Sequence, residues 1–373
     1  MNILRRLPLS RLLLLCGLVV AIGVSATAIA SALDSGATPP AKPLAQAVHD
    51  TLAGAQGAHL EGLSANIQLT DHLLEGASLA SGNGGGAGGG GLTSSPLVTG
   101  ASGRLWVAND GRVRLELQSQ KGDTQIVSDG HTVTLYDAAT NTVYRYTPPA
   151  HEEGSSSAEE SSGEQHEVPS VAKIEEAISH LNKHADVSGA TPTDVAGQPA
   201  YTVRVSPKEA GSLLGGAELS WDADNGVPLR AAIYSSTSSS PVIELAASDI
   251  SFGPVESSVF AITPPANAKV QEITFSEGDH QRDSEKAGAR EKPSVTTHGH
   301  GLGTIAVLET KSKGAAGTST SLEGLPKVTI NGSSASELRT ELGTLLTFER
   351  SGVRYLVGGA VAPAAVEEVA RGL

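Results

Sequence analysis

The histidines are the residues of this sequence whose spacing comes closest to a chemical site. His180 and His184 are four residues apart, the spacing that places two metal ligands on one face of a helix. On a helical wheel, however, both lie opposite the apolar stripe of their segment, and no third ligand is near in sequence. His298 and His300 lie in a polar segment. They could bind a metal ion there, or they could be solvated linker residues, which is the interpretation we favour. We therefore expect surface histidines and no metal site.

The glycine-rich segments lack the context that phosphate binding requires. The run at residues 84–91 is followed neither by Lys-Ser/Thr nor by a helix, so it predicts a flexible loop. Residues 301–306 match a dinucleotide fingerprint superficially, but they precede a strand and would offer a pyrophosphate no helix N-terminus. The sequence also contains no Gly-x-Ser-x-Gly elbow and no convincing nucleophile–base pair. We expect a protein that is not an enzyme, with no catalytic residue and no cofactor.

Length and composition narrow the class of protein further. The chain has 373 residues, which is long enough for two domains, and its net charge of −14 argues against nucleic acid or an anionic membrane surface as a partner. Aromatic residues make up only 3% of the chain, so the core must consist of Val, Leu, Ile and Ala. The single cysteine, Cys16, excludes a disulfide within the chain.

Residues 1–33 have the pattern of an export signal. Arg5, Arg6 and Arg11 precede an apolar run at residues 12–32 that ends in small residues, as before a cleavage site. A run of about 20 apolar residues is also long enough to remain as a membrane anchor. Cleavage and anchoring both stay open, and both predict an extracytoplasmic protein, secreted or anchored to the plasma membrane by residues 12–32.

Residues 103–146 predict an antiparallel meander with one apolar face. Val113, Leu115 and Leu117 alternate with polar residues, the period of a strand with one dry face and one wet face. Asn109-Asp110-Gly111 and the turn at residues 128–130 are hairpin signals, because glycine accepts the positive φ that such turns need. The single apolar face must be covered by something.

The rest of the chain predicts two helices over this sheet, more strands, and a separate C-terminal unit. We expect helices at residues 43–52 and 169–184, a first strand at 63–69, and later strands at 200–205, 217–221, 228–234, 242–252 and 270–275. A Ser/Glu-rich loop is expected at 151–167. In the C-terminal part we expect strands at 302–308, 327–330, 343–348 and 353–357, and helices at 336–342 and 363–373. The domains would be residues 34–273 and 301–373, joined by a polar linker at 274–300.

Several motifs resemble those of LolA-type lipoprotein carriers. They are Leu105-Trp106-Val107 before a turn, residues 126–130 and 134–137, and residues 260–270, which are similar to the closing strand of that family. The resemblance covers residues 40–273 and implies an α+β fold, a curved antiparallel half-barrel sheet covered by two lid helices, followed here by a small C-terminal α/β domain. Asn109-Asp110 stand where the carriers have Arg-Pro, so the fold is better supported than the carriers' lipoprotein hand-over. The domain order is similar to that of RseB-type regulators.

A curved sheet of short aliphatic side chains beneath two helices either fills itself or leaves an apolar groove that fits an acyl chain. Sparse aromatic residues favour the groove, and a fully packed core is the alternative. Trp106 faces away from it. The candidate lining residues are Leu63, Ile67, Leu105, Val107, Val113, Leu115, Leu117, Ile126, Val133 and Leu135 from the sheet, and Val48, Leu52, Ile174 and Ile178 from the helices.

Three functions are compatible with this pattern. The first is an exported, non-enzymatic carrier that holds a lipid or the acyl chain of a lipoprotein in the half-barrel. The second is an RseB-like envelope-stress regulator, whose C-terminal domain acts on a membrane anti-sigma factor. A hydrolase that uses the scattered histidines is the third and has the least support.

Overall fold

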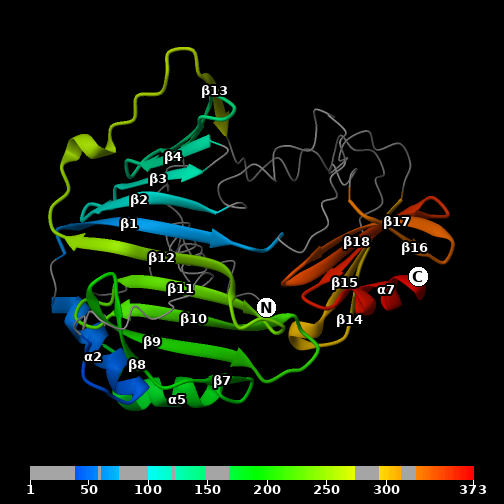
Figure 1. Ribbon diagram of the computed structural model, residues 1–373, viewed down its shortest axis with the longest axis horizontal. Coiled ribbons are helices and arrows are strands. Elements are labelled where there is room, and N and C mark those ends of the chain that lie inside the picture. The colour runs from blue at the N-terminus through cyan, green and yellow to red at the C-terminus, as the bar shows by residue number, and fades with distance from the viewer. Residues whose placement is uncertain are drawn as a thin grey trace, which may run out of the picture.

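The computed structural model describes residues 38–57, 60–74, 100–119, 122–147, 168–273, 294–311 and 325–373. The predicted export segment at 1–33, the Gly run at 84–91, the loop at 151–167 and most of the polar linker lie outside these residues. The described part forms a 13-stranded sheet and a 6-stranded sheet, with few helices. In Figure 1 the second sheet lies beside one end of the strands of the first.

The large sheet is antiparallel except at one edge, and it is open. Its strands follow the order β13-β6-β5-β4-β3-β2-β1-β12-β11-β10-β9-β7, with β8 also paired to β9. Their bounds are β1 Gly62–Asp71, β2 Ala101–Ala108, β3 Val113–Ser119, β4 Gly122–Ser128, β5 Val133–Asp137, β6 Thr142–Tyr146, β7 Ala185–Val187, β8 Thr191–Val195, β9 Gln198–Pro207, β10 Leu214–Asp222, β11 Pro228–Ser235, β12 Pro241–Phe252 and β13 Lys269–Ile273.

The predicted meander is confirmed as β2 to β6, and each consecutive pair is antiparallel. Gly111 and Gly130 have φ of 85° and 91° in the two predicted turns, a conformation that favours glycine. The predicted strand at 63–69 is β1, which pairs with β2 on one side and with β12 on the other. β1 therefore joins two antiparallel arrays into one surface.

The closing strand reaches the sheet by a different route from the other strands. After β12, the chain forms the 3-10 helix η2 (Ser257–Phe260) and then β13, which pairs in parallel with β6 at the far edge. Figure 1 shows this segment leaving β12 and passing round β1 to β4. β7 and β8 were not predicted, because three to five residues rich in Thr, Pro and Asp carry almost no apolar alternation.

Two helices lie at the β7–β9 end of the large sheet (Figure 1). The predicted helix at 43–52 is α2 (Leu44–Gly57), and the predicted helix at 169–184 is α5 (Val171–Leu181), which is capped by the Ser170 side chain. α2 is anchored through Thr51, whose hydroxyl accepts a hydrogen bond from Trp221 Nε1 at 3.1 Å. Both side chains are buried.

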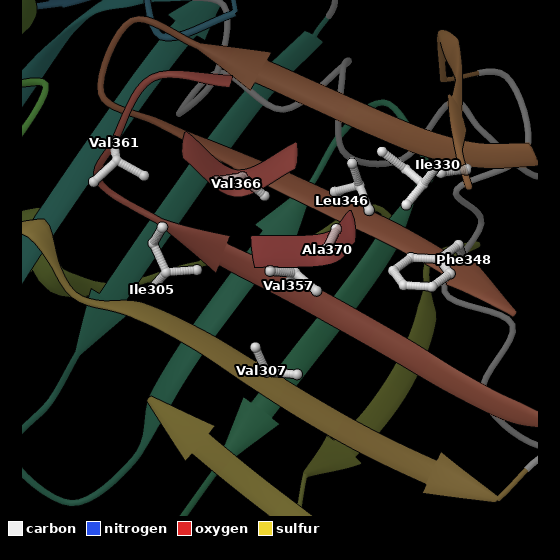
Figure 2. Packing of buried hydrophobic residues seen from close by; sticks show 10 residues of the cluster. Ile305, Val307, Ile330, Leu346, Phe348, Val357, Val361, Val366 and Ala370 are labelled. Carbon is white, nitrogen blue, oxygen red and sulfur yellow. The ribbon is translucent and has the colours of Figure 1, made fainter. Parts of the chain in front are cut away.

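The C-terminal unit is an antiparallel sheet that packs against one helix. The strand order is β14-β15-β19-β18-β17-β16, with bounds β14 Ser294–His298, β15 Ile305–Lys311, β16 Lys327–Ile330, β17 Ser333–Thr340, β18 Gly343–Arg350 and β19 Val353–Gly359. The predicted helix at 363–373 is α7 (Pro363–Arg371). Val366 and Ala370 of α7 lie against Leu346 and Val357 of the sheet, as Figure 2 shows. All four side chains are fully buried.

Two predictions for the C-terminal part were wrong. Residues 336–340 belong to a strand and 341–342 to the turn that follows, with no helix there, because β17 pairs with β16 and β18 on its two sides. Helix-favouring Glu and Leu residues are overridden there by tertiary packing, with Ala335 and Glu337 both buried. Residues 294–298, assigned to the polar linker, form the edge strand β14, whose residues are exposed and therefore have the polar composition of a linker.

The buried bond between Trp221 and Thr51 gives a first prediction. Thr51→Val leaves the indole N–H without its acceptor, so we expect the free energy of unfolding to fall by about 1–3 kcal/mol in chemical denaturation. Thr191→Val makes the same exchange at an exposed position of β8 and serves as the control. Equal effects of the two substitutions would contradict the assigned role of Thr51.

Candidate ligand-binding surface

Strand register brings the predicted apolar side chains onto one face of the large sheet. Residues that lie opposite each other on neighbouring strands share a face, and so do residues two apart on one strand. One row across the sheet is Ile250–Ala65–Leu105–Leu115–Ile126–Leu135. A second is Leu69–Leu245–Ala231–Leu219–Val203. We call the face that carries these rows the apolar face.

Most of the predicted lining residues on this face are only partly buried. Ile67 and Leu117 are 7% and 3% exposed and belong to the core. The residues of intermediate exposure are Leu63, Leu105, Val107, Val113, Leu115, Ile126, Val133 and Leu135. Among the described residues these side chains are less completely packed than Ile67 and Leu117, although Leu105 and Leu115 contact the same core cluster. The prediction that these strand residues share one face is therefore confirmed, although their role as ligand contacts stays a prediction.

The four lining residues predicted on the helices differ in burial and in the elements that they contact. Val48 of α2 packs with Val203 and Leu219 of the second row, so α2 covers the β9–β10 end of the apolar face. Leu52 is 41% exposed. Ile174 is buried and Ile178 partly buried in α5, which contacts α2 and β7. These helix residues do not meet the half-exposed rows of β2 to β5 in the part of the chain that is described.

A partly open cavity of about 90 Å³ lies on the apolar face between β1, β2, β11 and β12. Leu63, Ile67 and Leu105 of its lining are among the residues predicted from the sequence. The residues that β11 and β12 contribute were not predicted, among them Leu229, Ala231, Leu245, Ala247 and Ile250. Alternation within the predicted strands at 228–234 and 242–252 is the signal that would have found them, but the pairing of β12 with β1 and of β11 with β12 cannot be read from sequence.

The opposite face of β2 to β4 is covered by the segment around η2. Trp106, on this opposite face as predicted, packs with Phe260, Ala108 and Val127. The Arg114 guanidinium holds the segment in place by donating to the carbonyl oxygens of Val259 and Ala261 at 2.7 and 3.0 Å. The sheet is thus covered on this face, while the apolar face stays partly open.

The opposite face of β9 to β12 carries a ladder of charged residues. Glu218 accepts from Arg230 at 2.5 Å and from the Tyr234 hydroxyl at 3.3 Å, while the Arg204 guanidinium lies 4.0 Å from the centre of the Tyr234 ring. Burial, and then the negative charge of Glu218, raise the pKa of Tyr234 to about 12. These groups satisfy one another and so form a structural network rather than a catalytic site.

The structure places the histidines at the surface. His180 is exposed in the last turn of α5, and His184 is exposed beyond its end, with ring centres 6.5 Å apart. His298 and His300 are exposed as well. In the described ranges, no three His, Cys, Asp or Glu side chains are grouped so that they could hold a metal ion. Among those same residues no helix is both long and apolar enough to cross a membrane.

Comparison with known proteins gives one partial family match. Residues 92–155 match the model of DUF2092, a family described as predicted periplasmic proteins. The match spans less than half of the chain. No curated protein matches the chain.

Solved structures give broader but distant likenesses. The crystal structure of MucB in complex with MucA(peri) is 14% identical, with a TM-score of 0.41 over 88% of this chain and 96% of that one. The Pseudomonas aeruginosa MucA/MucB complex is 15% identical, with a TM-score of 0.39 over 87% and 96%. A LolA superfamily protein from Nitrosomonas europaea is 9% identical, with a TM-score of 0.23 over 59% and 99%. The LolA-type resemblance seen in the sequence thus recurs, but at these scores it assigns neither function nor partner.

The raised pKa of Tyr234 gives a prediction about pH. Because the folded value of about 12 exceeds the ordinary value of 10.0, the stabilisation from neutral Tyr234 is complete below pH 10.0 and is lost as pH rises through about 12. We expect Tyr234→Phe to lose less stability than the parent over this interval in denaturation measured at each pH. Tyr146→Phe, in β6 beside the edge strand β13, is the control. The same pH dependence for parent and Tyr234→Phe would contradict the assignment.

Proposed function

We propose that this protein is an exported, non-enzymatic binding protein that holds an acyl chain of a lipid or lipoprotein on the apolar face of its large sheet. The observation that carries the proposal is the row of half-exposed Leu, Val and Ile side chains across β2 to β5. Each methylene group that leaves water on such a surface gains about 0.8 kcal/mol. The partly open cavity of about 90 Å³ is too small for a whole acyl chain, so the chain must also lie along the open rows.

The finer architecture forms part of the proposal. The curved sheet acts as a half-barrel in which α2 and α5 serve as lids, and the packing of Val48 against Val203 and Leu219 supports this role for α2. Residues 34–273 form the binding domain, and the second sheet with α7 forms a separate C-terminal domain. The protein works outside the cytoplasm, secreted or anchored by residues 12–32, which the match to a family of predicted periplasmic proteins supports.

A polar substitution on the apolar face tests the proposal. Leu105→Gln replaces an apolar side chain that lines the cavity on the apolar face. We expect the full-length variant to bind a neutral pyrene-labelled diacylglycerol about tenfold more weakly than the parent chain does. The measurement is a fluorescence titration, supported by native mass spectrometry of acyl lipid that co-purifies with the chain.

Arg104→Gln provides the matched control, because it changes the neighbouring side chain on the opposite face of the same strand. It should leave binding of the diacylglycerol unchanged. Failure of the unmodified chain to bind the probe, or an equal loss in both variants, would sink the proposed function.

A regulator that acts through its C-terminal domain is the second candidate. MucB has been solved in complex with MucA(peri). In the chain studied here, the edge strand β14 is exposed along its whole length, with Val295 64% exposed, and an exposed edge strand is open to a partner. We propose as the alternative that this domain contacts a membrane protein such as an anti-sigma factor.

Site-specific photo-crosslinking separates the two candidates. A crosslinker at Val295 should attach to a single membrane protein if the regulator is correct. A crosslinker at Val270 is the control, since this valine is 56% exposed on the edge strand of the first sheet. Absence of a membrane-protein adduct at Val295, or the same adduct from both positions, would exclude the alternative.

A further inference from the structure

A second and larger cavity lies where the two sheets meet. Its volume is about 620 Å³, and its walls are mostly apolar. Val205 and Ala217 come from β9 and β10, whereas Leu302 comes from the short helix η3 (Gly301–Gly303) beside the C-terminal sheet. We call it the junction cavity. Its occupant would touch both parts of the chain at once.

The junction cavity opens onto the same face of the sheet as the half-exposed rows. Ile243, Ile233, Ala217 and Val205 form a row across β12, β11, β10 and β9. Ala217 is two residues from Leu219, a member of the second apolar row, so both side chains point to the apolar face. Adjacent rows lie about 7 Å apart along a strand. The lining of the junction cavity therefore adjoins the second apolar row, whose members Val203 and Leu219 are packed against α2 while Ala231 and Leu245 line the smaller cavity.

The polar groups of the junction cavity are confined to a few side chains. Lys183, His184, Lys208 and Glu209 line it. The Lys208 ammonium donates to Asn182 O at 2.6 Å and lies 3.3 Å from the Asp186 carboxylate. An ammonium has three N–H donors, so one remains for a ligand after these two contacts.

The other charged side chains of the cavity, Lys183 and Glu209, have different neighbours. The Lys183 ammonium lies 3.5 Å from His180 Nδ1. The Glu209 carboxylate is turned toward the C-terminal part, where it accepts from Leu302 N at 3.1 Å and lies 3.9 Å from His300 Nε2. A Cβ on Gly301 would overlap this carboxylate. The Glu209 carboxylate therefore faces the C-terminal part. Of the two ammonium groups, Lys208 is shared with Asp186, while Lys183 has no carboxylate partner among the described residues.

We propose that the junction cavity binds the carboxylate end of a fatty-acid-like amphiphile, with Lys183 and Lys208 at its head group and its acyl chain directed onto the apolar face. This inference rests on the proposed function, because it names the chemical class of the ligand. Among the described residues Lys208 is already paired with Asp186, whereas Lys183 forms no ion pair, so an anionic head group supplies a partner that a neutral lipid does not.

The same loop that lines the cavity also holds the C-terminal sheet. Leu213 N donates to Ala360 O at 2.7 Å, the Ser212 hydroxyl donates to the same carbonyl oxygen at 3.0 Å, and Ser212 forms a β-bridge with Val361. Lys208, Glu209 and Leu214 of this connection line the cavity. A bound ligand thus contacts the connection through which the two sheets are joined.

The test compares the fluorescent fatty acid cis-parinaric acid with its methyl ester on the full-length chain. We expect the acid to bind about threefold to tenfold more tightly than the ester, since two exposed ion pairs each contribute a few tenths to 1 kcal/mol. Lys183→Gln combined with Lys208→Gln should remove this preference. Lys173→Gln, an exposed lysine elsewhere on α5, should leave it unchanged.

Leu302 provides a second, independent arm because it is 42% exposed and its exchange does not threaten the core. Leu302→Glu should weaken binding of the acid more than Leu302→Gln does, and the two variants should bind the ester equally. Thermal unfolding of each variant checks that the chain is folded.

The outcomes separate this inference from the proposed function. Equal binding of acid and ester, or an acid preference that ignores Lys183, Lys208 and Leu302, overturns the inference and leaves acyl binding on the apolar face intact. Failure of both probes and of the neutral diacylglycerol overturns both proposals.

Discussion

The structure depends on the pairing of β1 with strands that are far from it in sequence. β1 lies between β2 and β12, and this register aligns the apolar residues of the meander with those of β9 to β12. A shift of one residue would turn Ala65, Ile67 and Leu69 to the other face and would break the first row at Ala65 and the second at Leu69. The burial of these three side chains opposes such a shift. The apolar face is therefore a product of one strand's register.

Much of this arrangement can be predicted from the sequence because it depends on local patterns. Alternation in β2 to β6 and the glycines at Gly111 and Gly130 identify the meander, and the apolar stripe of α7 identifies a helix. The pairing of strands that are distant in sequence cannot be predicted in this way. This pairing is what brings β11 and β12 to the cavity on the apolar face. Residues 336–342 were misread for a related reason, since neighbours on both sides impose the extended form on β17.

The two faces of the large sheet are stabilised by different chemistry. One carries charged and aromatic groups that satisfy each other, such as Arg114 with the carbonyl oxygens near η2, and Glu218 with Arg230. The apolar face has α2 at one end, and half-exposed aliphatic side chains over β2 to β5. The apolar face also contains core residues, among them Ile67 and Leu117, so it contributes to the stability of the fold as well as carrying the partly buried side chains.

The return of the chain from β12 to β13 has a consequence for how the protein opens. This segment begins beside β1 at the middle of the sheet, crosses β2 to β4 with Phe260 buried against them, and ends paired to β6 at the edge. A meander without such a strap can fray one strand at a time from its free border. Here β6 cannot detach while the strap holds, so we infer that amide hydrogens of β2 to β6 exchange as a single cooperative unit.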